Sequence, residues 1–158
     1  MLGGETEPAP NNNYDSSNCS TYGLSDSSLQ SQGYIDSEGN LNPQYDAATA
    51  NWGGDWRMPT KTEMQELINN CTWTWTTQNG VNGYKVTSKV NSNYIFLPAA
   101  GCRDGSSLYC AGSSGFYWSS APRESSSYFA YRLYFNSSGQ GMYDYYRIFG
   151  QSVRPVIE

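Results

Sequence analysis

The sequence predicts an α+β domain in which two helices are followed by a mostly antiparallel arrangement of short strands. Three observations support this class: a helix start signal near residue 42, an amphipathic helix signal from residue 61, and strand-type alternation after Cys71. The chain has 158 residues, enough for one domain with a single core. We expect that domain to span residues 21–158.

Residues 1–20 are polar and rich in Asn, Pro and Ser. Such a segment buries too little apolar surface to fold by itself, so we expect a flexible N-terminal arm. Residues 22–42 then predict short strands and turns.

The first helix is expected to begin at the Asn-Pro pair of residues 42–43, because proline is favoured at the first helical position. Tyr45, Ala48 and Trp52 would share one face of this helix. Gly53 would end it.

The second helix has the clearest signal in the chain. Thr60 and Glu63 have the spacing of a capping box, in which each side chain accepts the other residue's backbone N–H. Arg57, which precedes them, is expected to form an ion pair with Asp55 or Glu63 rather than to contact a substrate. Four apolar residues at helical spacing predict a helix over residues 61–71: Met64, Leu67, Ile68 and Cys71.

Strand-type patterns begin directly after this helix. Residues 72–76 alternate bulky and small side chains. Residues 83–87 and 94–98 predict a hairpin with its turn near Asn91.

Residues 101–115 have a loop-like composition, and residues 117–120 predict a short strand. In residues 129–135 the odd-numbered positions are all apolar or aromatic, which predicts a strand with one buried face. The residues expected on that face are Phe129, Tyr131, Leu133 and Phe135.

The segment from Tyr143 to Gly150 lacks such alternation, so several of its aromatic side chains are expected to be exposed. Eight of the fourteen tyrosines lie at or after Tyr109, among many Ser, Gly and Arg residues. This mixture is typical of binding surfaces, because Tyr gives rigid contact area and Ser and Gly give adaptable hydrogen bonds. The alternative is that the tyrosines only pack within strands.

Composition excludes several functions. The net charge is −5 and no basic run occurs, which argues against a nucleic-acid partner. The absence of histidine removes His-based acid/base chemistry and His metal ligation. No apolar run is long enough to span a membrane, so direct membrane insertion is not expected.

No cysteine belongs to a C-x-x-C pair, so we expect neither a zinc site nor a thioredoxin-like one. No metal and no cofactor are expected. Four cysteines allow three disulfide pairings, and free buried thiols are an equal alternative. The cysteines are Cys19, Cys71, Cys102 and Cys110.

Five motifs in order resemble the Fibrobacter succinogenes major paralogous domain family, over roughly residues 20–158. They are residues 53–60 (GGDWRMPT), 70–75 (NCTWTW), 96–101 (FLPAAG), 117–120 (YWSS) and 150–156 (GQSVRPV). The resemblance implies an exported bacterial domain with a C-type-lectin-like fold, similar to the formylglycine-generating enzyme.

That enzyme holds copper with a cysteine pair, but nothing around Cys102 and Cys110 matches its pattern. The Glu-Pro-Asn, Gln-Pro-Asp and Trp-Asn-Asp triplets of calcium-dependent C-type lectins are also absent. We therefore expect neither catalysis nor calcium-dependent sugar binding.

A narrower resemblance is to the variable proteins of diversity-generating retroelements, which share this fold and carry a hypervariable C-terminal ligand-binding patch. Mutagenesis in that family changes adenines of Asn codons and can produce Tyr, Asp, Arg, Ile, Phe, Ser, Cys or Gly. Every residue from Tyr143 to Gly150 is of a reachable type, whereas the flanking Gln140, Met142 and Gln151 are not. Further residues that fit the pattern are Cys102, Arg103, Tyr109, Cys110, Phe116, Arg123 and Tyr128.

These observations favour a non-catalytic ligand-binding domain whose partner is a protein or a glycan on another surface. The resemblance implies an extracellular or cell-surface location, or a phage particle, with export depending on a signal outside this sequence. The alternative is a structural surface or adhesin subunit without a dedicated ligand site. The predicted ligand-binding residues are Arg103, Tyr109, Arg123, Tyr128, Tyr143, Tyr145, Tyr146, Arg147 and Phe149.

Overall fold

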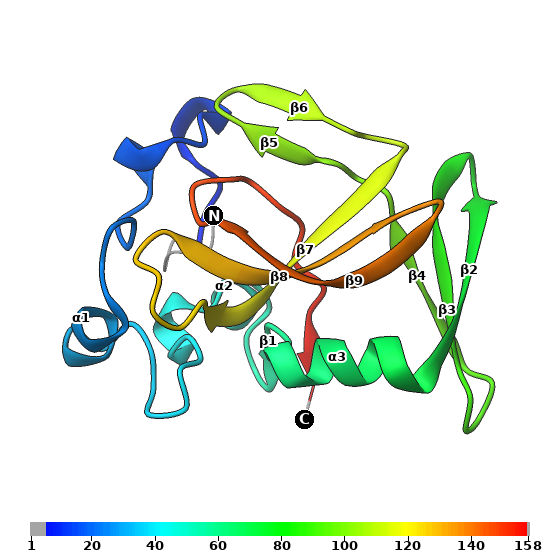
Figure 1. Cartoon of the computed structure of the whole chain (residues 1–158), viewed down its shortest axis with the longest axis horizontal. Helices are drawn as coiled ribbons and strands as arrows, with labels where there is room; N and C mark the ends of the chain where they lie inside the picture. Colours follow the sequence, from blue (N-terminus) through cyan, green and yellow to red (C-terminus); the bar gives the residue numbers. More distant parts are fainter. Residues whose placement is uncertain (1–5, 158) are drawn as a thin grey trace.

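A three-stranded antiparallel sheet lies at the centre of the computed structural model, which describes residues 6–157. Its strands are β7 (Ser114–Pro122), β8 (Phe129–Asn136) and β9 (Gly139–Tyr146), with β8 in the middle. Figure 1 shows a helix beneath this sheet and a small hairpin above it. The described chain combines three short α-helices with several small antiparallel sheets, so the α+β prediction is confirmed.

A second antiparallel sheet stands beside the first (Figure 1). It consists of β2 (Cys71–Gln78), β3 (Val81–Ser88) and β4 (Tyr94–Pro98), and the pairing of β3 with β4 confirms the predicted hairpin. Trp73 and Trp75 alternate with more exposed threonines along β2 and pack against the core.

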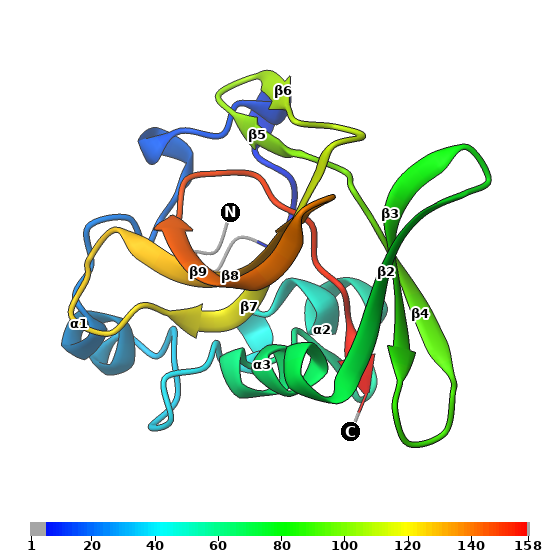
Figure 2. The ribbon, with the colours of Figure 1, turned by 45° about the vertical axis from the view of Figure 1, so that its right-hand side comes forward.

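The helix beneath the central sheet is α3 (Lys61–Asn70), and it confirms the predicted second helix (Figure 2). Both hydrogen bonds of the capping box are present: Glu63 N donates to Thr60 Oγ1 at 3.2 Å, and Thr60 N donates to Glu63 Oε2 at 2.8 Å. Met64 is buried in a core cluster that contains residues of both sheets. Arg57 donates two hydrogen bonds to the Glu63 carboxylate at 2.7 and 2.8 Å, which confirms the expected ion pair.

Hydrogen bonds from Arg57 and, after them, from Thr60 outweigh the opposing effect of burial and lower the pKa of Glu63 from 4.5 to about 2. A depressed carboxyl pKa stabilises the fold above pH 4.5, and this contribution is lost as the pH falls from 4.5 toward 2. Because the pair is partly exposed, we expect Glu63→Gln to lower the free energy of unfolding at pH 7 by only about 1 kcal/mol. Urea denaturation should find this difference at pH 7 and not near pH 2.

Glu66→Gln is the matched control, since Glu66 is an exposed carboxylate on the same helix. It should leave stability nearly unchanged at both pH values. A Glu63→Gln effect of equal size at pH 7 and near pH 2 would contradict the role of the carboxylate charge.

The predicted first helix is divided in two. Residues Pro43–Tyr45 form a short 3-10 helix, and α2 (Ala47–Trp52) begins after Asp46. The Asp46 carboxylate is buried and accepts hydrogen bonds from the backbone N–H groups of Ala48 and Thr49, which caps α2. The expected shared face was wrong: Tyr45 lies in the separate 3-10 helix, and within α2 Ala48 is buried whereas Trp52 is exposed. Gly53 ends the helix as predicted, with a positive φ of 67°.

Residues 22–42, predicted as strands and turns, contain the additional helix α1 (Asp26–Ser31). Its only buried residue is Leu29, so no periodic apolar pattern signals it. Ser25 caps it by accepting a hydrogen bond from the Ser28 backbone N–H at 3.2 Å.

The expected N-terminal arm is described from residue 6, and residues 1–5 lie outside the described residues. Two short 3-10 helices occupy Pro10–Asn12 and Ser16–Asn18. Between them, Tyr14 exchanges two backbone hydrogen bonds with Gly105, each of 3.0 Å.

The loop-like residues 101–115 contain a hairpin of β5 (Cys102–Asp104) and β6 (Ser107–Tyr109), so that prediction was wrong. The sequence did not predict these strands because each has only three residues, too few to show an alternating pattern. A further short pair joins β1 (Trp56–Arg57) to β10 (Val156–Ile157). No helix within residues 6–157 has the length and apolar character needed to cross a membrane.

The central strand β8 is covered on both faces, which corrects the single buried face predicted for it. Leu133 and Phe135 point toward α3 and the second sheet and are fully buried, as predicted. Ala130 and Arg132, on the opposite face, are also buried, whereas Phe129 and Tyr131 are only partly covered. Arg132 lies beneath the β5–β6 hairpin, while Ala130 packs against Ala48, Met58 and Trp118. Alternation along one strand does not reveal this second cover.

Candidate ligand-binding site

A cavity of about 280 Å³ is lined by residues of the β5–β6 hairpin and of the face of the central sheet opposite α3, the upper face. We call it the hairpin cavity. Tyr109, Tyr145 and Phe149, all predicted site residues, come together in it. The complete lining is Cys102, Asp104, Tyr109, Cys110, Phe116, Arg132, Tyr145 and Phe149.

The chain after β9 holds the hairpin above the sheet. Gly150 exchanges two backbone hydrogen bonds with Arg103 of β5, at 2.7 and 2.9 Å. Two residues later, Ser152 donates to Phe116 O and accepts from Trp118 N, both at 3.0 Å on β7. This double attachment fixes the height of the cavity.

Strand alternation decides which side chains enter the cavity. Cys102 and Asp104 line it from β5, so Arg103 between them points away. The Arg103 guanidinium instead donates to Ser106 O at 3.1 Å. Arg103 was predicted as a site residue, and the structure places it outside the hairpin cavity.

Five lining residues were not among the predicted ligand-binding residues: Cys102, Asp104, Cys110, Phe116 and Arg132. Arg132 of β8 is the only cation among them. Its side chain lines the cavity although the residue is only 8 % exposed. The guanidinium carbon lies 4.0 Å from the centre of the Tyr145 ring and 4.8 Å from that of Phe116. Arg132 Nε is buried and has no hydrogen-bond partner within the described chain. Burial lowers the pKa of this guanidinium below its usual value, although an arginine remains charged at neutral pH.

Tyr143 lies beside the cavity on the same upper face, directly opposite Arg132 in the register of β8 and β9. It is 54 % exposed, and its ring packs edge-on against Tyr134 at 5.7 Å. Tyr109, at the end of β6, is 51 % exposed. These two tyrosines border the hairpin cavity with aromatic surface that the described chain leaves open.

A second group of predicted residues lies away from the cavity. Tyr146 packs on Phe129 at 4.4 Å, and Tyr128 packs edge-on against Tyr22 at 5.0 Å. Both Tyr128 and Tyr146 remain exposed. Arg123 forms a surface ion pair with Asp144, which alternates with Tyr145 and points to the lower face.

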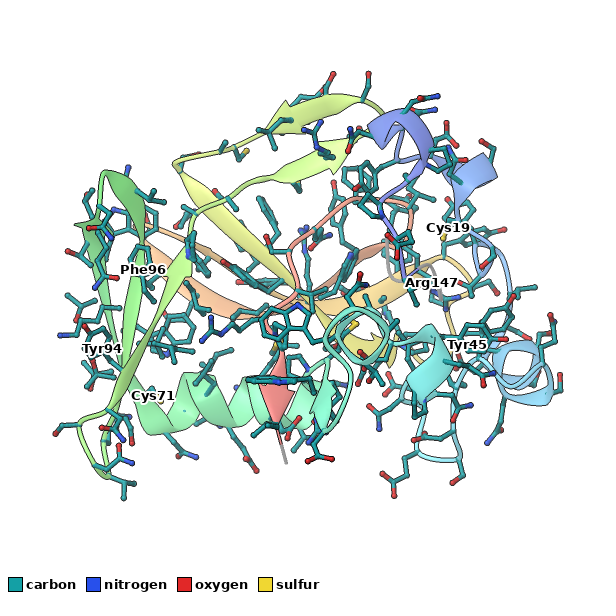
Figure 3. All side chains as sticks on the ribbon, turned by 180° about the vertical axis from the view of Figure 1, so that it is seen from behind. Cys19, Tyr45, Cys71, Tyr94, Phe96 and Arg147 are labelled. Carbon is teal, nitrogen blue, oxygen red and sulfur yellow. The ribbon has the colours of Figure 1, made fainter. Side chains whose placement is uncertain are left out.

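The prediction that Arg147 contacts a ligand was wrong, because the residue is 1 % exposed. Its guanidinium donates to the backbone carbonyls of Phe129, Thr21, Leu24 and Ser126 at 2.9 to 3.3 Å. Figure 3 shows Arg147 directed toward the N-terminal segment near Cys19. Its position between exposed aromatic residues in the sequence suggested exposure. The carbonyls that bind it belong to distant segments and leave no local pattern.

The two cysteines of the hairpin are free thiols, which resolves the pairing that the sequence left open for them. Burial raises the pKa of the Cys102 thiol, with the nearby Arg132 charge acting in the opposite direction. Cys110 is exposed. Across residues 6–157, no group of three or more Cys, Asp or Glu side chains is arranged to hold a metal ion.

A larger, polar depression of about 750 Å³ lies between α1 and the start of α3. None of the predicted site residues lines it. The aromatic and arginine side chains converge at the smaller hairpin cavity instead.

Comparison with known families adds one finding. A family model described as a domain of unknown function, DUF8237, matches residues 73–156, more than half of the chain. The chain belongs to the DUF8237 family. Neither the curated proteins nor the solved structures contain a match. The DUF8237 region includes every residue that lines the hairpin cavity, whereas Thr21 and Leu24, which bind Arg147, lie outside it.

Proposed function

We propose that the protein is a non-catalytic ligand-binding domain with a C-type-lectin-like fold, exported to a bacterial surface or carried on a phage particle. Its ligand is a protein or a glycan on another surface. The binding surface consists of the hairpin cavity, whose lining includes the exposed Tyr109, and of the exposed Tyr143 beside it.

One observation carries this proposal: aromatic side chains and a buried arginine from four strands converge on a single concave site. Tyrosine and arginine are enriched among residues that dominate binding energies, and such residues concentrate where water is excluded. Tyr109 and Tyr143 add exposed aromatic area at its border, which is a feature of interaction surfaces.

Diversification by a retroelement is the second part of the proposal. Six of the eight residues that line the cavity are among those that fit the adenine-mutagenesis pattern: Cys102, Tyr109, Cys110, Phe116, Tyr145 and Phe149. Residues that vary for the sake of binding should face one site. The other predicted ligand-binding residues of the set lie outside the cavity, so the six that line it support this part of the proposal. Sequencing the DNA around the gene tests this part. A nearby reverse transcriptase and a near-repeat differing at adenines would support it, and their absence would contradict it.

The double substitution Tyr109→Ala/Tyr143→Ala is expected to weaken ligand binding by about tenfold to a hundredfold, because truncated aromatic anchors cost about 1 to 3 kcal/mol. Both side chains are about half exposed, so the melting temperature should stay within a few degrees of wild type. Ligands would be found on arrays of glycans and of purified surface proteins, and affinities measured by surface plasmon resonance.

Tyr94→Ala is the matched control, because Tyr94 is equally exposed but lies on β4 of the second sheet. It should bind ligand like wild type. Unchanged binding by the double variant would favour the structural-subunit alternative, as would a large fall in melting temperature without a binding defect. Two observations support the structural-subunit alternative. Arg147 and Tyr128 were both predicted as site residues, but Arg147 binds backbone carbonyls inside the fold and Tyr128 packs against Tyr22.

A further inference from the structure

We propose that the hairpin cavity is a subsite for a carboxylate, in which Arg132 binds the anion between the rings of Phe116 and Tyr145. The inference rests on the proposed ligand-binding function and specifies the chemistry of the group that the ligand inserts. It begins from a buried arginine that forms no ion pair within the described structure.

Arg132 and Arg147 are both buried, but their environments differ. Arg147 donates hydrogen bonds to four backbone carbonyls, so its guanidinium is satisfied inside the fold. Arg132 Nε has no partner, and among residues 6–157 no carboxylate lies within ion-pair distance of Arg132. A buried charge without a partner is costly, and buried polar groups are nearly always paired in folded proteins. A buried arginine that lines a cavity and forms no ion pair is suited to bind an anionic group of a ligand.

The surroundings of the guanidinium favour a planar anion. Phe116 on β7 and Tyr145 on β9 lie on the two strands that flank β8, and the guanidinium is within 5 Å of both ring centres. Arg132 also lines the cavity, and an edge of its planar guanidinium carries the N–H groups from which an anion bound there would accept hydrogen bonds. A carboxylate matches this edge because two parallel N–H···O hydrogen bonds can form in one plane.

Charge selects a monoanion. Arg132 is the only cation among the lining residues, and the exposed Asp104 contributes one negative charge at the same cavity. A phosphate dianion needs more positive charge than one guanidinium opposed by a carboxylate supplies. Burial raises the pKa of the Cys102 thiol, so this lining residue adds no negative charge at pH 7.

Size and lining favour a carboxylate attached to an apolar or aromatic group. A cavity of about 280 Å³ is near the lower limit for small-molecule pockets, so it accepts a single side-chain-sized group. Four of its eight lining residues are aromatic, and they surround the arginine with apolar surface. Benzoate therefore serves as the probe, and benzamide is its neutral counterpart of the same shape.

The test measures binding of benzoate, benzamide and sulfate to the full chain by NMR chemical-shift titration and by the shift in melting temperature. We expect benzoate to bind at least about tenfold more tightly than benzamide or sulfate, with shift changes at β5, β6 and β8. Arg132→Met should abolish this preference, while Arg154→Met, which changes an exposed arginine elsewhere, should retain it. Asp104→Asn should tighten benzoate binding by about threefold, since it removes the opposing surface charge.

Equal affinity for benzoate and benzamide in the wild type would overturn the inference, even if Arg132→Met failed to fold. So would sulfate binding more tightly than benzoate, or undiminished benzoate binding by Arg132→Met. These outcomes are separate from the failure of the proposed function. A protein that ignores benzoate but loses its macromolecular ligand on Tyr109→Ala/Tyr143→Ala would contradict the carboxylate subsite alone.

Discussion

Replacing Arg147 by methionine is expected to lower the free energy of unfolding by about 3 kcal/mol or more. Four backbone carbonyls lose a charged donor at once, and hydrogen bonds to charged groups contribute about 1.5 to 3 kcal/mol each. Removing the buried cation returns part of this loss, because its desolvation cost also disappears. The net effect on the free energy of unfolding is still a loss, because methionine offers the four carbonyls no hydrogen-bond donor.

The loss should also be local. Thr21 and Leu24 precede α1, whereas Phe129 belongs to β8, so Arg147 connects the N-terminal segment to the central sheet. Hydrogen exchange should accelerate over residues 21–24 before it does in α3. Arg123→Met is the control, because its ion pair lies at the surface and contributes at most about 1 kcal/mol. Equal stability losses in the two variants would contradict the structural role given to Arg147.

Phe135→Ala is expected to lower the free energy of unfolding by about 3 to 5 kcal/mol, the range found when a buried phenylalanine is truncated. Phe135 is fully buried on β8, and its ring contacts Trp73, Trp75 and Tyr84 of the second sheet at 5.3 to 6.4 Å between centroids. Its removal leaves a void where the two sheets meet, and neighbours held in two sheets cannot close it easily.

Gly115 explains why the ring fits there. A Cβ atom at this position would lie 2.0 Å from Phe135 Cζ, so the absence of a side chain on β7 makes room for the ring. Urea denaturation of Phe135→Ala should be compared with that of Tyr143→Ala, an exposed position on the same sheet whose loss should stay within about 0.5 kcal/mol. Similar urea midpoints of unfolding for the two variants would show that packing of Phe135 does not stabilise the contact between the two sheets.

Local signals in the sequence were sufficient for α3 and for the β3–β4 hairpin. The capping box of α3 involves residues only three positions apart, and β3 and β4 are close in sequence. The alternation along β2 likewise indicates one buried face. Arg132 and Arg147 could not be interpreted in this way. Their environments depend on the β5–β6 hairpin and on Thr21, which are distant in sequence and become neighbours only in the fold. Composition located the region of the candidate site, while the tertiary arrangement decided which arginine faces the cavity.

Ligand contact with the hairpin cavity and its bordering tyrosines is tested most directly by hydrogen–deuterium exchange of the wild-type protein, bound to a ligand found on the arrays. We predict protection over β5, β6 and residues 143–149, with β2–β4 unchanged. Protection confined to β2–β4 or to α3, with the hairpin unaffected, would contradict the proposed binding surface.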